Sequence, residues 1–462
     1  MSSLSVGFAA TDITPPLGLP MAGYGSRDEL SQSVTDPLSA QALVLQSGDV
    51  SCAVVCCDLI GLEADFVAEV RERAAALSGL SADHIMICCS HTHWGPVVTG
   101  GGYLVRLLRD AVSGDYRAEL VEKLAQLVAA AQTARVPAVA GWGSGFAHGI
   151  SFNRRLVGPD FKTDMHLVLE PEPAAVASEA GNDLALAWEP GEHMGPRLSE
   201  PLEELDGRRV GPADAEVPLL RFDKTDGTPL AALANFACHA VCGGDSFYGY
   251  SADYVGHARA AFAAVVGCPM LFADGCAGDQ VPRWRQHDAR QRVGKSLGAE
   301  AAKVWLGVDE RAGEVELAVA RADVFLPLNP NIKPLAEAQA ALDAHPEPES
   351  NKAVWEREML ALATETQGMT EGYPVEVWAL RVGDCGLVAL AGEVLVEIGM
   401  QIKQRSPFPV TLVVSLANGC VGYLPTDNAC REGGYEPNWS PVGPGTERVL
   451  VEAAVALLEE LA

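Results

Sequence analysis

The sequence contains no apolar run of about 18 residues, the length that a membrane-spanning helix requires. Its first residues, MSSLSVGFAATDITPP, lack the basic segment and the long apolar segment of an export signal, so we expect a cytoplasmic protein. Basic residues are scarce, since 33 Lys and Arg against 61 Asp and Glu give a net charge of −28. Such an acidic chain repels phosphates, which argues against nucleic acid and stable membrane association and suits cationic or neutral small-molecule substrates.

Cys-x-x-Cys pairs with the spacing of a zinc site are also missing, although the chain has 12 cysteines. Several cysteines lie in apolar runs such as CAVVCCDL and HIMICCS, which predicts buried reduced thiols. No linker separates domains along the 462 residues. We therefore expect a single domain over 1–462, with a surface excursion at about 155–215 that is rich in Pro, Gly and acidic residues.

One pattern occurs three times along the chain. Two apolar runs joined by a turn, which predict a β-hairpin, are followed by a helical segment, a third apolar run and a polar loop. The copies begin at ALVLQSGDVSCAVVCCDL, VPLLRFDKTDGTPLAALANFACHAV and VWALRVGDCGLVALAGEVLVE. Repeated ββαβ-like units predict an α/β fold, a layered sandwich of mixed sheets flanked by helices. A chance likeness between common units is the alternative.

Polar residues stand where these predicted strands end. Asp58, His239 and Glu393 follow the hairpins, and the third strands lead to three further groups: His91 and His93; Asp274 and Asp279; Asn418 and Tyr423. Ligands gather at the ends of strands in α/β sheets, so units packed around a shared axis would bring these residues to one site.

The histidines and Glu393 are candidate metal ligands, each with a simpler alternative. His91 and His93 in SHTHWGP point the same way if the backbone is extended, which suits one ligand and one nearby donor. They could instead be a hydrogen-bonded loop pair. His239 in FACHAV could be a satisfied core residue, and Glu393 in ALAGEVLVE could be a helix-start glutamate.

Eight short motifs in register together resemble the catalytic domain of the neutral/alkaline non-lysosomal ceramidases, from about residue 5 to 460. They are TDITPPLG with MAGYG, SHTHWGP, SFNRR, FACHAV, GYSADYVGHA, GCAGD, GEVLVEIG and NGCVGYLP…GGYE. The resemblance implies one zinc ion per chain, with ligands at the positions of His91, His239, Glu393 and Tyr423. It further implies active-site roles for His93, Arg154 and Tyr435.

The chain departs from the ceramidases at several points. Val281 stands where they have a serine important for activity, and Cys420 replaces the first tyrosine of their Asn-x-Tyr-x-x-Tyr motif. The chain also stops before the position of their immunoglobulin-like domain. These departures argue against ceramide as the substrate.

We therefore expect a zinc-dependent hydrolase that cleaves an amide, or in second place an ester, of a small soluble substrate by means of a metal-activated water. His93, Arg154 and Tyr435 would stabilise the oxyanion or donate a proton, and Asp58 or Asp279 would orient a ligand histidine. A zinc hydrolase of a glycosidic or lactone bond and a non-catalytic metal-binding protein are the alternatives. A homo-oligomer is compatible with the sequence, as is another divalent metal.

Overall fold

The computed structural model describes residues 2–24, 27, 29–98, 114–159, 162–165, 167, 204–205, 208–285, 289–345 and 351–462. Within these residues no helix has the length and apolar character needed to cross a membrane. Most of the predicted surface excursion at 155–215 lies outside the described residues. Its described strands form a small sheet in the order β10 (Glu204–Leu205), β11 (Arg208–Val210), β8 (Arg155–Val157) and β9 (Thr163–Met165).

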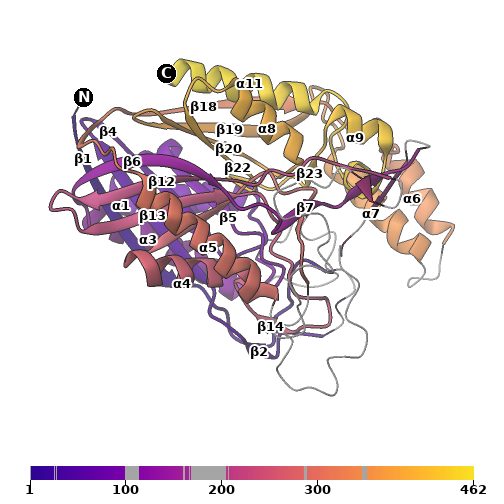
Figure 1. The fold of residues 1–462 in the computed structure, drawn as a ribbon. Coiled ribbons are helices and arrows are strands. Elements are labelled where there is room, and N and C mark those ends of the chain that lie inside the picture. The colour runs from indigo at the N-terminus through magenta and orange to yellow at the C-terminus, as the bar shows by residue number, and fades with distance from the viewer. Residues whose placement is uncertain are drawn as a thin grey trace.

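Two mixed sheets pack face to face, with helices on both outer sides (Figure 1). The larger sheet has the order β15 (Met270–Asp274), β13 (Pro229–Phe236), β12 (Glu216–Lys224), β6 (Val136–Phe146), β1 (Ser2–Asp12), β3 (Ser39–Ser47), β4 (Val50–Cys57) and β5 (Ile85–Cys89), and β17 (Glu314–Val315) pairs with β1. The smaller sheet has the order β18 (Leu317–Leu326), β19 (Tyr373–Val382), β20 (Cys385–Leu390) and β22 (Val410–Val414).

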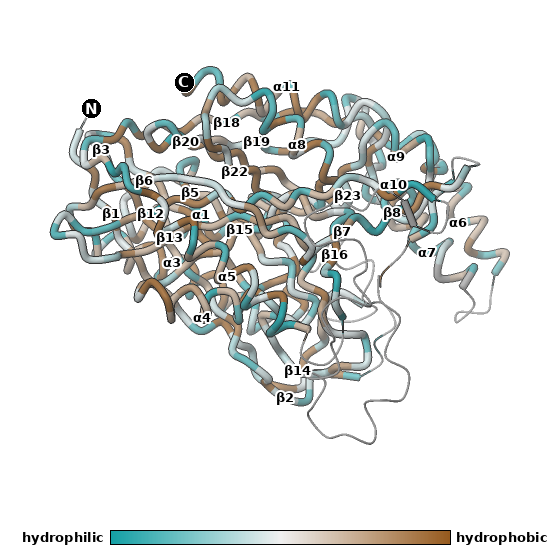
Figure 2. Tube along the Cα trace, viewed as in Figure 1, coloured by the Kyte–Doolittle hydropathy of each residue, from teal (hydrophilic) through white to brown (hydrophobic). Residues whose placement is uncertain are grey.

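Apolar side chains of both sheets meet in a shared core, which includes Leu43, Leu220, Leu380 and Leu412. Helices cover the outer faces: α1 (Ala64–Ser78), α3 (Gly114–Thr133), α4 (Asp253–Val266) and α5 (Ala289–Gly307) on the larger sheet, and α8 (Val396–Arg405) and α11 (Thr446–Leu461) on the smaller one. In Figure 2, α11 alternates between apolar and polar segments, as expected for a helix with one buried face. The predicted layered α/β sandwich is confirmed.

The predicted ββαβ units are also present. Each hairpin is followed by a helix and by a strand parallel to the second hairpin strand, in the sets β3–β4–α1–β5, β12–β13–α4–β15 and β19–β20–α8–β22. The first two units form opposite edges of the larger sheet, and the third belongs to the smaller sheet.

Main-chain hydrogen bonds join the ends of the three units. Cys89 N–H, at the end of β5, donates to Leu416 O at 3.3 Å, just after β22. Ser415 N–H donates to Asp274 O at 3.0 Å, at the end of β15, and Leu416 N–H donates to Gly392 O at 3.0 Å. The strand ends of all three units therefore meet in one place.

The remaining elements lie around this meeting point or at the periphery. They are β2 (Ser33–Val34), β7 (Ser151–Asn153), β14 (Gly249–Tyr250), β16 (Gln280–Pro282), β21 (Glu393–Val394), β23 (Tyr423–Leu424), a 3-10 turn (Ala82–His84), α6 (Leu335–Asp343), α7 (Asn351–Glu365), α9 (Asp427–Glu432) and α10 (Tyr435–Asn438). Two of them, β21 and β23, pair in parallel with Glu393 opposite Tyr423.

Candidate metal centre

The two histidines of SHTHWGP converge, but not through an extended backbone. His91 has φ 59°, in the left-handed region that non-glycine residues seldom adopt. The ring centres of His91 and His93 lie 4.8 Å apart, and their Nε2 atoms are 3.3 Å apart. Strained backbone of this kind concentrates at functional sites, because the surrounding structure must hold it in place.

His239, just after β13, completes a group of three histidines whose ligand atoms all lie within 4.8 Å of one another. This group could hold a metal ion. Burial, together with the charge of His91, lowers the pKa of His239 to about 4. Burial and the other two histidines likewise lower the pKa of His93 well below its usual value. His93 and His239 are therefore neutral at pH 7, which is the form that binds metals.

Glu393 supplies the one carboxylate in direct contact with the histidines among the residues described. Its Oε2 atom is 3.3 Å from His91 Nε2 and 3.3 Å from His239 Nε2, and all three side chains are buried. Burial would raise the pKa of Glu393, but the facing histidines outweigh it and hold the pKa well below its usual value. A buried carboxylate thus faces buried imidazole nitrogens.

The hydrogen bonding of these atoms fits a metal ion. His239 Nε2 and Glu393 Oε2 are buried and have no hydrogen-bond partner within the described part of the chain. Unpaired buried polar atoms are costly in proteins. The Nδ1 atoms, on the other side of the rings, are already engaged, that of His91 with Ile60 O at 2.7 Å and that of His239 with Ala277 O at 2.5 Å. This arrangement leaves Nε2 as the atom that faces a metal.

Neither Asp58 nor Asp279 orients a ligand histidine. Main-chain carbonyl oxygens contact the Nδ1 atoms of His91 and His239 instead. Asp58 is paired with Arg259 at 2.5 Å and accepts a hydrogen bond from Ser39 N–H. Asp279 accepts hydrogen bonds from Asn153 Nδ2 at 2.7 Å and from Val396 N–H at 3.0 Å. Asp279 therefore ties β7 and the start of α8 together behind the site.

Tyr423 and Arg154 lie in direct contact beside Glu393. Arg154 Nη2 donates to the Tyr423 hydroxyl at 3.1 Å and to Gly278 O at 2.8 Å. Tyr423 is buried, and burial together with the charge of Glu393 raises its pKa well above the usual value. Tyr435, on α10, has its ring centre 5.6 Å from that of Tyr423, and burial raises its pKa to about 12.

Glu436 is the buried partner of the arginines, and the sequence motifs gave it no role. It accepts from Arg154 Nε at 2.8 Å and from Arg155 Nη1 at 2.5 Å. Burial would raise the pKa of Glu436, but the two guanidinium charges outweigh it and lower the pKa. Two sequence features could have indicated this pairing: the adjacent arginines in SFNRR and the glutamate that follows Tyr435.

Val281 offers no hydroxyl group at the position of the ceramidase serine. It lies in β16, fully buried, and packs with Phe152 and Val241 in a small apolar cluster. Cys420 is likewise buried in the core beneath α1 and α3.

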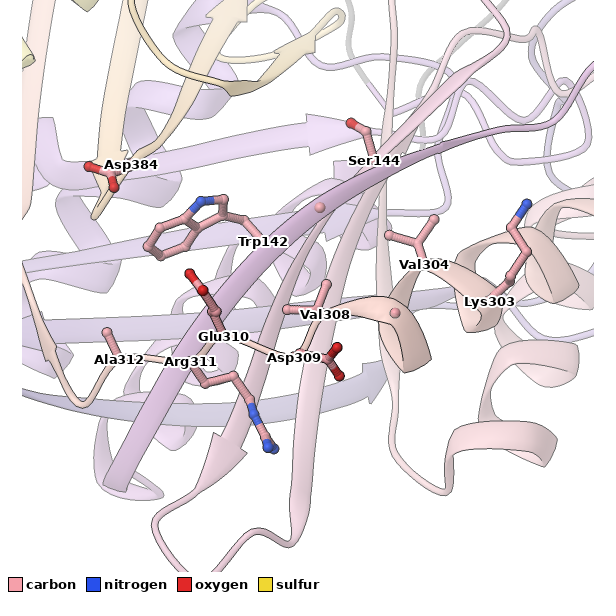
Figure 3. A pocket seen from close by; sticks show the side chains of 12 residues that line it. Trp142, Ser144, Lys303, Val304, Val308, Asp309, Glu310, Arg311, Ala312 and Asp384 are labelled. Atoms are coloured by element: carbon pink, nitrogen blue, oxygen red, sulfur yellow. The ribbon is translucent and has the colours of Figure 1, made fainter.

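A hollow lies elsewhere, between β6 and the C-terminal end of α5 (Figure 3). It has a volume of about 890 Å³ and is lined by Trp142, Lys303, Asp309, Arg311 and Asp384 among others. None of the residues of the metal centre lines it. Because it has no cluster of metal-ligating side chains in the described residues, we do not assign the chemistry to it.

The fold and the buried His/Glu cluster define an α/β protein with a candidate metal centre at the strand ends. Solved structures with this fold include neutral ceramidase from Pseudomonas aeruginosa, with a TM-score of 0.72 and 19% identity over 100% of this chain and 75% of that one. A ceramidase complexed with C2 matches with a TM-score of 0.71 and 18% identity, covering 100% and 76%. No family model and no curated protein matches the chain. The resemblance to ceramidases inferred from the motifs is confirmed at the level of the fold.

Proposed function

We propose that the chain is a zinc-dependent hydrolase that cleaves an amide bond, or in second place an ester bond, of a small soluble substrate. The observation that carries the proposal is the Glu393 carboxylate 3.3 Å from two buried imidazole nitrogens, with no other partner for its Oε2 atom in the described residues. The fold shared with ceramidases supports an amide as the bond, because those proteins are named for cleaving one.

His91, His239 and Glu393 would hold the zinc, with Tyr423 as a fourth and weaker ligand, and one ion would bind per chain. When bound, zinc would polarise the scissile carbonyl and lower the pKa of water towards neutrality. The phenol of Tyr423 must at least partly ionise to become a ligand, which makes it a weaker ligand than the imidazoles and the carboxylate. We therefore assign Tyr423 more to catalysis than to metal affinity.

Three further groups surround the place where a carbonyl would bind. Arg154 is fixed by Glu436 and Gly278 O, so its charge is held in position to stabilise a developing oxyanion. Tyr435, half-buried beside Tyr423, is a proton donor with a hydroxyl still protonated at pH 7. The neutral His93 ring can act as a hydrogen-bond donor or as a third imidazole ligand.

Elemental analysis of protein purified without chelator tests the metal, and a hydrolysis screen tests the reaction. We expect about one zinc per chain, and release of amine from simple N-acyl amides. The screen should include glycosides and lactones, since turnover of these alone would move the proposal to another bond. Less than about 0.2 metal per chain, with His91→Ala indistinguishable from wild type, would end the metal hypothesis.

A further inference from the structure

Strand β18 lies at one edge of the smaller sheet. Its ten residues run antiparallel to β19 in an unbroken register, from Leu317 opposite Val382 to Leu326 opposite Tyr373. Helix α11 packs against one face of this sheet. Among the described residues, only those of β19 form main-chain hydrogen bonds with β18. An edge strand of this kind presents a row of N–H and C=O groups that can pair with another strand.

The register determines which main-chain groups of β18 point outward. Gly383 N–H donates to Glu316 O at 2.8 Å, and these two residues are opposite each other, one position beyond the pair of Leu317 and Val382. Hydrogen-bonded pairs alternate along an antiparallel ladder, so the even-numbered residues of β18 bond to β19. The odd-numbered residues direct their N–H and C=O groups to the free edge, and they include Val319, Arg321, Asp323 and Phe325.

These odd-numbered residues are arranged symmetrically in charge and polarity about Ala322. Arg321 and Asp323 stand on either side of it, and both are exposed. Val319 and Phe325 stand farther out at equal distances, and Phe325 is 48% exposed. In a second copy running antiparallel about an axis through Ala322, Arg321 is opposite the partner's Asp323 and Val319 is opposite the partner's Phe325. Opposite charges and apolar side chains placed directly across a ladder stabilise it.

Main-chain geometry and charge select the same register. Two copies of β18 can form hydrogen-bonded pairs only between residues whose groups point outward in both strands, which are the odd-numbered ones. An axis through Arg321 or through Asp323 meets this condition but places two like charges opposite each other, which is destabilising. An axis through Ala322 meets it and pairs each arginine with an aspartate.

The two charged side chains can accept further partners. Arg321 Nη2 donates to both carboxylate oxygens of Asp323 at 2.9 Å, and Arg321 Nη1 is 2.5 Å from Asp83. A guanidinium has five N–H donors and a carboxylate has about four acceptor positions. The contacts within one chain therefore leave capacity for the same pair of groups from a second chain.

We propose that two copies of the chain associate through antiparallel pairing of their β18 strands about Ala322, which joins the two smaller sheets into one continuous sheet. The four odd-numbered pairs exchange about eight main-chain hydrogen bonds, two in each pair. Charges on an edge strand commonly block pairing with other strands, and here they match only a strand with the same order of charges. The inference does not depend on the proposed function.

Sedimentation velocity measures the association. We expect the mean mass of wild type to rise from the 48.6 kDa of one chain towards twice that value between about 1 and 100 μM, because one strand pair is a small interface. Asp323→Arg places arginines opposite each other and Arg321→Asp places aspartates opposite each other, so each should raise Kd by about tenfold or more. An equal mixture of the two variants pairs arginine with aspartate again and should restore the association.

Asp226→Arg is the matched control for charge. It makes the same change as Asp323→Arg, in the exposed turn between β12 and β13 of the larger sheet. The control should associate like wild type.

Ala322→Cys tests the register directly. A residue on the axis faces its own copy in a pair without hydrogen bonds, with Cα atoms about 4.5 Å apart, a distance that a disulfide spans. Ala320→Cys is its control, because Ala320 lies on the same face of β18 but its two copies are about 14 Å apart. Oxidised glutathione should link Ala322→Cys into a covalent dimer and leave Ala320→Cys and wild type as single chains, since the native cysteines are buried or, for Cys430, half-buried.

Three results would each overturn the proposal. They are a wild type that stays monomeric at every concentration, association unchanged in both charge variants, and equal cross-linking of Ala320→Cys and Ala322→Cys. Association lost in the charge variants and not recovered in their mixture would also overturn it, because the loss would then not come from the pairing of charges. None of these measurements requires catalytic activity.

Discussion

Replacing Glu393 by Gln changes one oxygen for an amide nitrogen and removes the negative charge that faces His91 and His239 at 3.3 Å. Mutation of a residue that only supports a metal ligand lowers metal affinity by about 10–100-fold. Mutation of a direct ligand should therefore lower the affinity for zinc by at least about 100-fold. We expect Glu393→Gln to be purified with far less than one zinc per chain. The retained imidazoles alone would not hold the ion through purification.

The same substitution should abolish the stabilisation that the metal gives. At free zinc 100 times above its Kd, wild type gains about 2.7 kcal/mol, whereas a 100-fold weaker site gains roughly 0.4 kcal/mol at that concentration. A change of one kcal/mol shifts Tm by about 2–4 °C in chains of about 150–250 residues, and by less in longer chains. Loss of about 2.7 kcal/mol on adding chelator should therefore lower the Tm of wild type by about 5 °C or less. The variant should show almost none.

Differential scanning calorimetry with and without chelator, alongside elemental analysis, measures both quantities. Glu397→Gln is the matched control, because it makes the same chemical change four positions along and Glu397 has no contact with the histidines in the described residues. The control should keep its zinc and its chelator response. A Glu393→Gln protein with one zinc per chain and the full chelator shift would refute the assignment of Glu393 as a ligand.

Three further predictions follow from the same site. Tyr423→Phe should lower kcat by about 10²-fold or more while zinc content stays near one per chain, as expected for a group acting mainly on the transition state, and equal loss of both would contradict that role. Glu436→Gln should cost about 3–5 kcal/mol in denaturant unfolding, because it removes the buried carboxylate that pairs with Arg154 and leaves Arg155 only Glu432, at 3.5 Å. A loss below about 1 kcal/mol would show that the pairing is dispensable. Long-chain ceramide should be turned over far more slowly than about 10 per second, because Val281 offers no hydroxyl group. Turnover above that rate would show that the effect of Val281 was misjudged.

The three hairpin–helix–strand units could be predicted because each is encoded locally. Apolar runs, a turn and a helical period lie within about 50 residues of one another, and these signals need no knowledge of the rest of the fold. The placement of the units could not be predicted in the same way. The first two units occupy opposite edges of one sheet. The strands between them are β6 and β1, which belong to none of the three units.

The candidate site was predictable as a set of residues but not in its supporting contacts. His91, His239 and Glu393 stand at the ends of apolar strands, where polar side chains are conspicuous. The contacts of His91 and His239 Nδ1 are with main-chain carbonyls, which every residue possesses, so no sequence pattern marks them. The left-handed backbone at His91 was missed for a related reason, since glycine is the usual marker of that conformation.

The main-chain hydrogen bonds between the strand ends have a consequence for folding. His91, His239 and Glu393 each come from a different unit, so no single unit presents more than one of them. A partly folded chain would therefore bind zinc weakly, and the ion would not nucleate folding as it does in a zinc finger. The site forms only when both sheets have docked. Docking requires contacts between residues that are distant in sequence, and such contacts slow folding. Metal uptake would thus report that the three units have assembled and that both sheets have docked.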